Sequence, residues 1–547
     1  MSIETKSTKS AKSATTAKSA TTAKPAAGAL RPLTKVLIAN RGEIALRIVR
    51  ACRELGIASV AVYSDADANA PHVRAADEAV HIGPAAASES YLRGDHLIEV
   101  AQRVGADAVH PGYGFLSERE WFARAVRDAG LIWIGPPAEA IAAMGSKTAA
   151  RTLAIAAGTP VVPGTTQALT DANEAEKLAG EFGYPVLLKA VAGGGGKGMR
   201  VVHHASEIAN ALGSAQREAK NAFGDDAVYI EKYIEGPRHV EIQVLADTHG
   251  NCIALGEREC SIQRRHQKMV EEAPSVAVSP ELRKRMGDAA VAAAKAAGYV
   301  NAGTCEFLLD KNGEFYFLEM NTRIQVEHPV TELVMGIDLV QWQLRIARGE
   351  RLPFTTAPEP NGWAIECRIT SEDPANGFLP STGRITHLQL PAGPGVRWDG
   401  GITTGSVVGL SYDPMLAKLI VHAPTRELAI ARMERALREL VIDGVETSRE
   451  FHLRVMADAD YRAGNVTIQW LEQKLPALLG QQPPAETIRA AAIAAALLAE
   501  RDRGGRPNVN TNARGSAAGS GGTSAAALGS ATSQSAWADL ARREGLR

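Results

Sequence analysis

The sequence predicts a soluble multidomain protein that combines an α/β region with α+β regions. Three observations support this fold class. The chain has 547 residues, which is too long for a single hydrophobic core. From Lys35 onward a rhythm of strand, turn, helix and strand appears, as is typical of a parallel, doubly wound sheet. After Gly236 strands dominate, so we expect an α+β arrangement there.

Taken in order, the elements divide the compact part of the chain into four segments. Within residues 34–158 we expect strand KVLIA, turn NRGE, helix IALRIVRACREL and strands SVAVYS and ADAVH. Residues 159–235 contain strand PVLLKA, a glycine-rich loop, strand MRVVHH, a helix and strand VYIEKYI. Residues 236–360 contain strand HVEIQVLAD and the hairpin EFLLDKNGEFYFLEMN. Residues 361–478 contain strand AIECRI and end in the helix TRELAIARMERALREL.

The N-terminal end differs from this compact part. Up to about Arg31 the chain is rich in Lys, Ala, Ser and Thr, and the hexad AKSATT occurs twice between Ala11 and Thr22. Such a composition cannot bury enough apolar surface to fold, so we predict a disordered tail over residues 1–33. Because acidic residues are scarce, a mitochondrial-type presequence, and thus import into an organelle, stays open as the alternative.

The C-terminal end, residues 479–547, is also expected to lie outside the compact domains. Ala485 to Arg503 is an Ala-rich helix candidate, and a Gly/Ser/Asn/Ala linker follows to about Ser535. The last segment, AWADLARREGLR, has two interpretations, a short docking helix for a partner or a frayed terminus.

Composition excludes several classes of partner. Hydrophobic residues make up 45% of the chain and the formal net charge is -1, so charge gives no general attraction to nucleic acid or to an anionic membrane. No apolar run approaches the roughly 20 residues that span a bilayer. The five cysteines form no Cys-x-x-Cys pair, so we predict neither disulfides nor a zinc site, and we expect a reducing, cytoplasmic compartment.

The glycine-rich loop AGGGGKGMR, residues 192–200, predicts a phosphate-binding lid. It matches G-x-G-x-x-G at Gly193, Gly195 and Gly198, but a strand follows instead of the helix that a dinucleotide fingerprint requires. It also lacks the spacing of a Walker A motif. Its N–H groups can close over phosphate oxygens, with Lys197 in the loop and Lys189 on the preceding strand as cations. The alternative is a surface loop that binds nothing.

The hairpin EFLLDKNGEFYFLEMN predicts a metal site. A two-residue turn at Asn312-Gly313 predicts the pairs Leu309–Tyr316, Phe307–Leu318 and Glu306–Glu319. Facing carboxylates destabilise a sheet unless a cation lies between them, and carboxylate oxygens are the usual ligands of Mg²⁺. Asn321 points to the same face and adds a neutral oxygen. The alternative is a solvated edge hairpin.

The next segment, NTRIQVEHP, predicts a reactive face beside that metal. If the strand alternation continues past Asn321, then Arg323, Gln325 and Glu327 share one face. An arginine, a carboxylate base and metal ligands at one place suit phosphoryl transfer. Taken singly, Arg323 and Glu327 have an alternative as members of surface ion pairs.

Several of these motifs, read together, resemble one family. The sequence is similar to the biotin carboxylase family of the ATP-grasp superfamily in IANRGEIALRI, HPGYGFLSE, MGSK, GGGGKGMR, EKYIEGPRHVEIQ, ERECSIQRRHQK, EMNTRIQVEHPVTE and YDPMLAKL. The resemblance implies a Rossmann-like N-terminal domain at 34–158, an ATP-grasp lid at 159–235, an ATP-grasp core at 236–360 and a biotin carboxylase C-terminal domain at 361–478. It also implies ATP-dependent carboxylation of biotin by bicarbonate through carboxyphosphate.

The same resemblance implies roles for individual residues. Those expected to bind the nucleotide are Lys147, Lys189, Gly195, Gly196, Glu231, Lys232, Tyr233, Ile234, His239, Gln263 and His266. Those expected to bind Mg²⁺ or Mn²⁺ are Glu306, Glu319 and Asn321. Those expected to hold bicarbonate or biotin are Lys268, Arg323, Gln325, Val326 and Arg397, with Glu327 as the base.

Some of these residues have structural alternatives. Arg397, expected to stabilise the biotin enolate, has the alternative of packing against Trp398. His239, His266 and His328 have the alternative of hydrogen-bonded structural histidines. Cys260 lies in ERECSIQRRH, and we expect a buried or hydrogen-bonding thiol there and not a nucleophile.

The partners follow from what the chain lacks. Biotin carriers share an Ala-Met-Lys-Met tetrapeptide, which is absent here, so we expect the carrier and the carboxyltransferase on other polypeptides. The resemblance then implies a biotin carboxylase subunit of an acetyl-CoA, propionyl-CoA or related carboxylase, and a homodimer. Two rivals remain, another carboxyphosphate-forming ATP-grasp ligase and a catalytically idle regulatory subunit.

Overall fold

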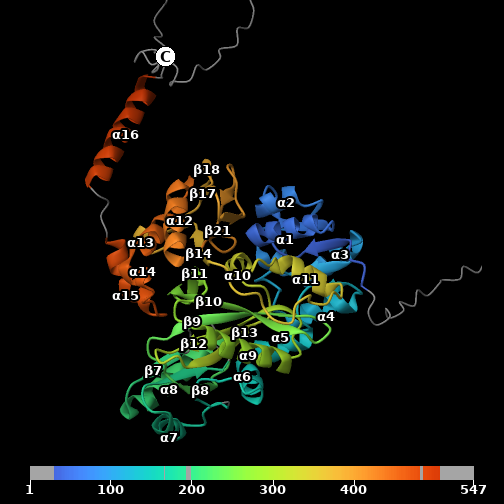
Figure 1. The fold of residues 1–547 in the computed structure, drawn as a ribbon, viewed down its shortest axis with the longest axis vertical. Helices are drawn as coiled ribbons and strands as arrows, with labels where there is room; N and C mark the ends of the chain where they lie inside the picture. The colour runs from blue at the N-terminus through green and yellow to red at the C-terminus, as the bar shows by residue number, and fades with distance from the viewer. Residues whose placement is uncertain (1–29, 166, 192–198, 481–484, 505–547) are drawn as a thin grey trace, which may run out of the picture. The chain divides into compact units, whose positions relative to one another are not determined.

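The computed structural model describes residues 30–165, 167–191, 199–480 and 485–504 (Figure 1). The chain divides into two units, residues 1–481 and 482–547. In the second unit the described part is one helix, α16 (Ala485–Gly504), which confirms the Ala-rich helix. None of the described helices has the length and apolar composition of a membrane span. Residues 1–29 of the predicted N-terminal tail, the glycine loop 193–198, the linker and the last helix lie outside the described residues. Leu33, at the end of the predicted tail, is instead buried in an apolar cluster.

A five-stranded parallel sheet forms the N-terminal region, as predicted. Its strand order is β3-β2-β1-β4-β5. The strands are β1 (Lys35–Ile38), β2 (Ala58–Ser64), β3 (Glu78–Gly83), β4 (Ala108–His110) and β5 (Ile132–Trp133). The helices are α1 (Gly42–Glu54), α2 (Pro71–Ala75), α3 (Gly94–Arg103), α4 (Glu120–Asp128) and α5 (Ala138–Gly145). Along β1, Val36 and Ile38 join one apolar cluster and Leu37 joins another, so both faces of the sheet are buried.

A small antiparallel sheet forms the next region. Its order is β7-β6-β8, made of β6 (Val186–Ala190), β7 (Met199–Val202) and β8 (Val228–Lys232). Helices α7 (Ala172–Phe182) and α8 (Ile208–Phe223) complete its core. The sequence patterns did not predict α7, which begins where the Asp171 side chain accepts hydrogen bonds from the backbone of Asn173 and Glu174. Helix α6 (Lys147–Ala156) precedes this region.

One eight-stranded sheet carries the rest of the first unit, in the order β13-β12-β9-β10-β11-β14-β21-β19. Its strands are β9 (Arg238–Ala246), β10 (Cys252–Arg264), β11 (Gln267–Ala273), β12 (Asn301–Leu309), β13 (Phe315–Asn321), β14 (Trp363–Thr370), β19 (Val396–Gly400) and β21 (Met415–Ala423). Its main helices are α9 (Pro280–Ala296), α10 (His328–Met335), α11 (Leu339–Ala347) and α12 (Arg426–Glu439), followed by α13 (Arg449–Ala457), α14 (Ala459–Ala463) and α15 (Trp470–Leu479). The sheet therefore runs through both predicted domains, 236–360 and 361–478.

The predicted hairpin forms, but its turn differs from the prediction. The Asp310 carboxylate accepts hydrogen bonds from the backbone of Asn312 and Glu314, and the loop spans three residues with Gly313 at φ 81°. The pairs near the turn are consequently Leu309–Phe315 and Phe307–Phe317, so the predicted pairs of Leu309 with Tyr316 and Phe307 with Leu318 were wrong. A bulge then shifts the register by one residue and restores the predicted pair Glu306–Glu319.

Candidate active site

A row of charged side chains crosses four strands of the large sheet. Arg258 on β10 is opposite Glu241 on β9, Glu241 is opposite Glu306 on β12, and Glu306 is opposite Glu319 on β13. Residues opposite one another in register point to the same face. Arg258 and Glu241 are fully buried and Glu306 is 5% exposed. Three adjacent carboxylates in a buried row require cations around them.

Lys268, on β11, supplies the central cation. Its Nζ donates to Glu241 Oε2 at 2.5 Å, to Glu306 Oε1 at 2.9 Å and to Glu327 Oε1 at 2.6 Å. Burial alone would lower the pKa of this lysine, but the three carboxylates raise it well above its ordinary value. Lys268 is therefore permanently protonated and positively charged. We call Lys268, Glu241, Glu306 and Glu327 the Lys268 cluster.

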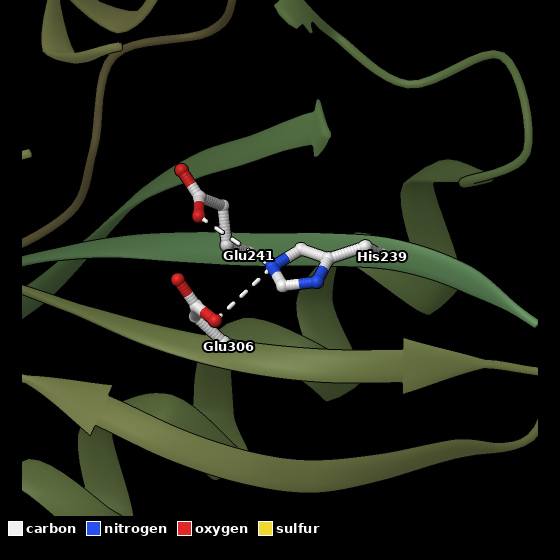
Figure 2. Close-up of side chains that lie close together, drawn as sticks. All are labelled: His239, Glu241 and Glu306. Atoms are coloured by element: carbon white, nitrogen blue, oxygen red, sulfur yellow. Dashed lines mark ion pairs between the residues drawn. The ribbon is translucent and has the colours of Figure 1, made fainter. Parts of the chain in front are cut away.

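His239 and Glu319 complete the carboxylate row. His239 Nε2 lies 3.2 Å from Glu306 Oε2 and 3.9 Å from Glu241 Oε2 (Figure 2). Burial disfavours the charged imidazole, yet Glu306 raises the His239 pKa overall. Burial and the neighbouring Glu306 raise the pKa of Glu319, whereas Lys268 and His239 hold the pKa of Glu306 well below its usual value despite burial. Glu306 and Glu319 therefore take up a proton at different pH values.

The facing pair has a donor set that fits a divalent cation. Asn321 Nδ2 donates to Glu306 Oε1 at 2.8 Å, so the three predicted metal ligands meet at one place. Among the described residues Glu319 makes no ion pair within 4 Å, although it is partly buried. A cation between Glu306 and Glu319 would relieve the repulsion that raises the Glu319 pKa.

The segment after β13 corrects the predicted strand alternation. β13 ends at Asn321, residues 322–327 turn, and α10 begins at His328, so Arg323, Gln325 and Glu327 do not share a strand face. The turn still brings two of them to the cluster, because Gln325 Nε2 donates to Glu306 Oε1 at 2.8 Å and Glu327 binds Lys268. Arg323 donates to Asn321 Oδ1 at 3.0 Å.

Arg258 holds this turn against the sheet. Its guanidinium donates to Glu241, to Gln243 Oε1 at 2.7 Å and to Gln325 Oε1 at 2.9 Å. It also donates to the hydroxyl groups of Thr304 and Thr331, both at 3.0 Å. Since all of these partners are buried, Arg258 acts as a structural cation that sets the place of Gln325 beside Glu306.

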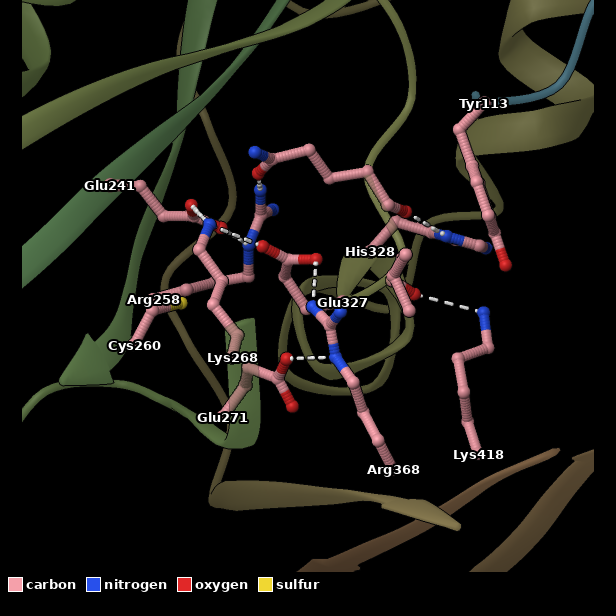
Figure 3. Close-up of polar contacts among 12 residues, drawn as sticks. Tyr113, Glu241, Arg258, Cys260, Lys268, Glu271, Glu327, His328, Arg368 and Lys418 are labelled. Atoms are coloured by element: carbon pink, nitrogen blue, oxygen red, sulfur yellow. Dashed lines mark hydrogen bonds and ion pairs between the residues drawn. The ribbon is translucent and has the colours of Figure 1, made fainter. Parts of the chain in front are cut away.

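Arg368, on β14, is the second cation beside Glu327. Its Nη2 donates to Glu327 Oε2 at 3.0 Å and its Nε donates to Glu271 Oε1 at 2.6 Å (Figure 3). Burial would raise the pKa of Glu327, but Lys268, Arg368 and Arg258 lower it well below its ordinary value. Glu327 is therefore ionised, as a proton acceptor must be.

Arg397 does not join the Lys268 cluster, which corrects its predicted place. Its guanidinium, on β19, donates to Glu332 Oε2 at 2.7 Å and to Asp399 Oδ2 at 2.6 Å. Arg47 binds the same Glu332 at 2.9 Å and Asp338 at 2.7 Å. We call these five residues the Arg397 cluster. The Arg397 guanidinium is therefore occupied by Glu332 and Asp399. The arginine that contacts Glu327 is Arg368.

Three of the predicted nucleotide residues, Lys147, Lys189 and Glu231, lie near one another. Lys189 Nζ lies 2.6 Å from Glu231 Oε2, and Arg151 lies 3.2 Å from Glu231 Oε1. Lys147 begins α6, and burial lowers its pKa while Glu319 opposes that change. Lys232 donates to the carbonyl groups of Gly183 and Tyr184 at 2.8 and 3.0 Å, so its side chain is used within the small sheet.

Two other predicted nucleotide residues lie at the β10–β11 hairpin. Gln263 Nε2 donates to the Cys260 carbonyl at 2.8 Å. His266 is exposed in a two-residue turn, where Arg265 at φ 50° and His266 at φ 65° both adopt the left-handed conformation. Residues other than glycine rarely adopt it, and such strain is common at ligand sites. Cys260 is fully buried, as expected, and burial raises its pKa well above the ordinary value.

The sequence patterns missed several charged residues at this site. These are Glu118, Glu241, Arg258, Glu271, Arg368 and Lys418, of which Lys418 donates to the Val326 carbonyl at 2.9 Å and Glu118 accepts from Arg323 at 3.1 Å. One signal was available, because Glu241 lies two residues after His239 in a strand and so shares its face. Charged residues inside the apolar strands β10, β11 and β14 were a second signal.

Comparison with known families assigns almost the whole first unit. Residues 32–141 match the family described as "Biotin carboxylase, N-terminal domain". Residues 146–355 match "Carbamoyl-phosphate synthase L chain, ATP binding domain", and residues 366–473 match "Biotin carboxylase C-terminal domain".

Individual relatives agree with these families. The chain is 53% identical over 442 residues to Biotin carboxylase 1 of Bacillus subtilis, covering 80% of this chain and 98% of that one. It is 53% identical over 441 residues to a pyruvate carboxylase component of Methanothermobacter thermautotrophicus, covering 80% and 90%. It is 50% identical to the alpha component of the mitochondrial methylcrotonoyl-CoA carboxylase of Rattus norvegicus, covering 81% of this chain but 62% of that one.

Solved structures resemble the fold as well. A biotin carboxylase complex from Campylobacter jejuni is 48% identical with a TM-score of 0.78, covering 81% of this chain and 99% of that one. The biotin carboxylase domain dimer of the Hydrogenobacter thermophilus 2-oxoglutarate carboxylase, in complex with MgADP, ADP and bicarbonate, is 48% identical with a TM-score of 0.77, covering 82% and 99%.

Proposed function

The chain belongs to the biotin carboxylase family, and from this premise we propose that it uses ATP and bicarbonate to carboxylate biotin held on a separate carrier protein. The observation that carries the proposal is the convergence of Lys268 on Glu306 and Glu327. It unites a metal ligand, a fixed cation for an anionic substrate and an ionised base within one hydrogen-bonded group.

Glu327 acts as the general base. Bicarbonate binds to Lys268 and Arg323, with Gln325 and the Val326 N–H completing the contacts. When the Lys268 ammonium also binds bicarbonate, its contact with Glu327 weakens. The pKa of the Glu327 carboxyl group then rises, so Glu327 becomes a stronger base. Glu327 then accepts the bicarbonate proton while the bicarbonate oxygen attacks the γ-phosphorus of ATP, which forms carboxyphosphate and ADP.

The resemblance to the family also supplies the residues proposed for the nucleotide and its metal. Glu306, Glu319 and Asn321 fit Mg²⁺ or Mn²⁺, which neutralises phosphate charge when bound. Residues proposed to hold ATP are Lys147, Lys189, Gly195, Gly196, Glu231, Lys232, Tyr233, Ile234, His239, Gln263 and His266. Lys189 is held by Glu231 in this structure, so an ATP phosphate would share the ammonium with that carboxylate.

Arg368 takes the role that the sequence prediction gave to Arg397. Support comes from the contact of Arg368 with the proposed base Glu327, which Arg397 does not make. A fixed cation there stabilises the negative charge that develops on the ureido oxygen of biotin when the ring nitrogen loses its proton.

The proposed setting is an acyl-CoA carboxylase in the cytoplasm. A biotin carrier and a separate carboxyltransferase act with the chain, which forms a homodimer. Support comes from a methylcrotonoyl-CoA carboxylase component among the relatives and from a dimer among the similar structures. Five free cysteines favour a reducing compartment, although some relatives are mitochondrial.

The test is ADP release by the purified chain with Mg²⁺ and ATP, with and without bicarbonate and free biotin. We expect release that needs both bicarbonate and biotin. Release that needs bicarbonate but ignores biotin would favour a different carboxyphosphate-forming ligase. No release, even with a biotinylated carrier protein present, would favour an idle regulatory subunit.

A further inference from the structure

Two buried carboxyl groups face each other behind Arg368. Glu271 on β11 is directly opposite Glu366 on β14, and both are 0% exposed. Glu271 Oε1 accepts from Arg368 Nε at 2.6 Å. Among the described residues, Glu271 Oε2 and both Glu366 oxygens have no hydrogen-bond partner. Two ionised carboxylates in this arrangement would repel each other and remain without hydrogen bonds, which is costly in a buried site.

The cations around this pair are already in use. Arg368, on the same face of β14, divides its guanidinium between Glu271 and Glu327. On β21, Lys418 donates to the Val326 carbonyl at 2.9 Å and lies 3.2 Å from Glu43 Oε1. On α10, His328 is fully buried, and burial together with Lys418 lowers its pKa well below the ordinary value, so it is neutral.

Because Arg368 and Lys418 bind other groups, Glu366 has no counter-ion among the described residues. Burial raises its pKa well above the ordinary value, and the neighbouring Glu271 and Glu327 raise it further, against Lys418 and Arg368. Burial also raises the pKa of Glu271, to about 7, although Arg368 lowers it. Geometry and charge therefore agree that the pair does not carry two negative charges.

We propose that Glu271 and Glu366 hold one proton between them, and that the pair is a positioning element whose single negative charge fixes Arg368 against Glu327. The proposal rests on the proposed function, because it assigns Arg368 and Glu327 to the reaction. With two charges behind it, the guanidinium would be drawn away from Glu327. With none, Arg368 would bind Glu327 alone and weaken it as a base.

The first test does not depend on turnover. Infrared spectroscopy of the purified chain at neutral pH is expected to show the carbonyl stretch of a buried protonated carboxyl group, and Glu366→Gln is expected to remove it. The matched control is Glu372→Gln, on the short strand β15 (Glu372–Asp373), which keeps the band. A spectrum without such a band, or a difference spectrum of wild type minus Glu366→Gln in which no carboxyl band is lost, would overturn the shared proton even if biotin carboxylation is confirmed.

The second test measures whether one charge is shared. Glu366→Gln is expected to lower kcat about twofold, Glu271→Gln about tenfold, and the double variant more than a hundredfold, because only the double variant removes the last charge behind Arg368. The wild-type rate falls at alkaline pH as the second carboxyl group ionises, and Glu366→Gln loses this fall. A double variant that equals the product of the single effects, or an unchanged alkaline fall, would contradict the proposal.

The thermal unfolding of each variant separates these results from misfolding. Glutamine has the shape of a protonated glutamic acid, so Glu366→Gln is expected to unfold at the wild-type temperature. A Glu366→Gln chain that unfolds early would show that Glu366 is ionised, and this outcome also overturns the shared proton. If biotin-dependent ADP release is absent from the wild type, the infrared result still decides the question.

Discussion

The Lys268 cluster and the Arg397 cluster both bury cations among carboxylates, but they are built differently. In the Lys268 cluster one ammonium serves three carboxylates. In the Arg397 cluster two guanidinium groups serve three carboxylates, and each guanidinium binds two of them. Guanidinium groups are planar forks that saturate carboxylates, whereas an ammonium is a compact charge that can move its contacts to a ligand.

Both clusters contain neighbouring carboxylates that titrate differently, since burial and Glu332 raise the pKa of Asp338 in the Arg397 cluster. Burial would raise the pKa of Glu332, but Arg47 and Arg397 lower it to about 2, so this carboxylate stays ionised. In the carboxylate row the pKa of Glu306 is lowered and that of its neighbour Glu319 is raised. Neighbouring groups whose pKa values are pushed apart are typical of reactive sites. Titration therefore does not separate the clusters, and we expect the Lys268 cluster to be the reactive one because its ammonium can move its contacts to a ligand.

The largest expected effect is on the base of the Lys268 cluster. Glu327→Gln is expected to lower kcat for biotin-dependent ADP release by about 10²- to 10⁴-fold, because the amide cannot accept the bicarbonate proton. The free energy of unfolding is also expected to fall, because Lys268 and Arg368 lose a buried carboxylate partner, so the kinetics are measured at a temperature where the variant is folded. Steady-state kinetics with the exposed variant Glu446→Gln as the control measure this effect, and a Glu327→Gln rate within a few-fold of wild type would remove Glu327 from the reaction.

The next effect is on the facing carboxylates. Glu306→Gln and Glu319→Gln are expected to lower turnover at low Mg²⁺ by about 10- to 100-fold, because each removes a charged metal ligand. The fold should persist, since the substitutions relieve repulsion in the row. Glu314→Gln, exposed on the same hairpin, is the matched control. Full activity of either variant at low Mg²⁺ would leave the metal site without support.

A substitution in the Arg397 cluster is expected to lower the stability of the fold. Arg397→Met is expected to lower the free energy of unfolding by about 3 to 5 kcal/mol, because it strips Asp399 and Glu332 of a buried partner. Chemical denaturation measures this loss, with the exposed Arg438→Met as the control. An Arg397→Met chain as stable as wild type would show that the cluster does not hold the fold.

A smaller expected effect is the loss of stability when the buried His452 is protonated in mild acid. His452 is fully buried, its Nε2 contacts the Arg368 carbonyl at 2.7 Å, and burial lowers its pKa to about 4. Since the unfolded chain takes up this proton first, stability is complete above about pH 6.5 and falls between about pH 6.5 and 4, by up to about 3 kcal/mol. The Glu332 contribution of the Arg397 cluster is lost in stronger acid, between about pH 4.5 and 2.

His452→Gln tests this order of events. The variant is expected to show a shallower loss of stability between about pH 6.5 and 4, by up to one proton in the pH slope. Denaturation across that range is the measurement. An identical slope in variant and wild type would mean that His452 is not the group that titrates.

Much of the fold could be predicted because its signals are local. The parallel sheet came from continuous apolar strands such as that at Lys35–Ile38, and the facing pair Glu306–Glu319 came from the hairpin. The turn was mispredicted because the Asp310 side chain binds the loop backbone and makes a third loop residue favourable. The predicted pair Glu306–Glu319 forms only because a bulge shifts the register back by one residue. No local sequence pattern predicted this bulge.

The reactive site was harder to predict because its partners are distant in sequence. Lys268 and Glu327 are adjacent only through the order of strands in the large sheet, and Arg368 joins them from β14. The alternation extended from Asn321 failed because the chain turns into α10 at His328. Arg397 was misplaced since nothing in its own segment reveals that Glu332 and Asp399 enclose it.

The most direct test of the central claim compares two arginines. Biotin-dependent ADP release should be measured for Arg368→Met and Arg397→Met at a temperature where both chains are folded. Because Arg368 contacts the base and Arg397 does not, kcat is expected to fall more than about a hundredfold in the first and less than about threefold in the second. Equal losses, or a greater loss in Arg397→Met, would contradict the division between a reactive and a structural cluster.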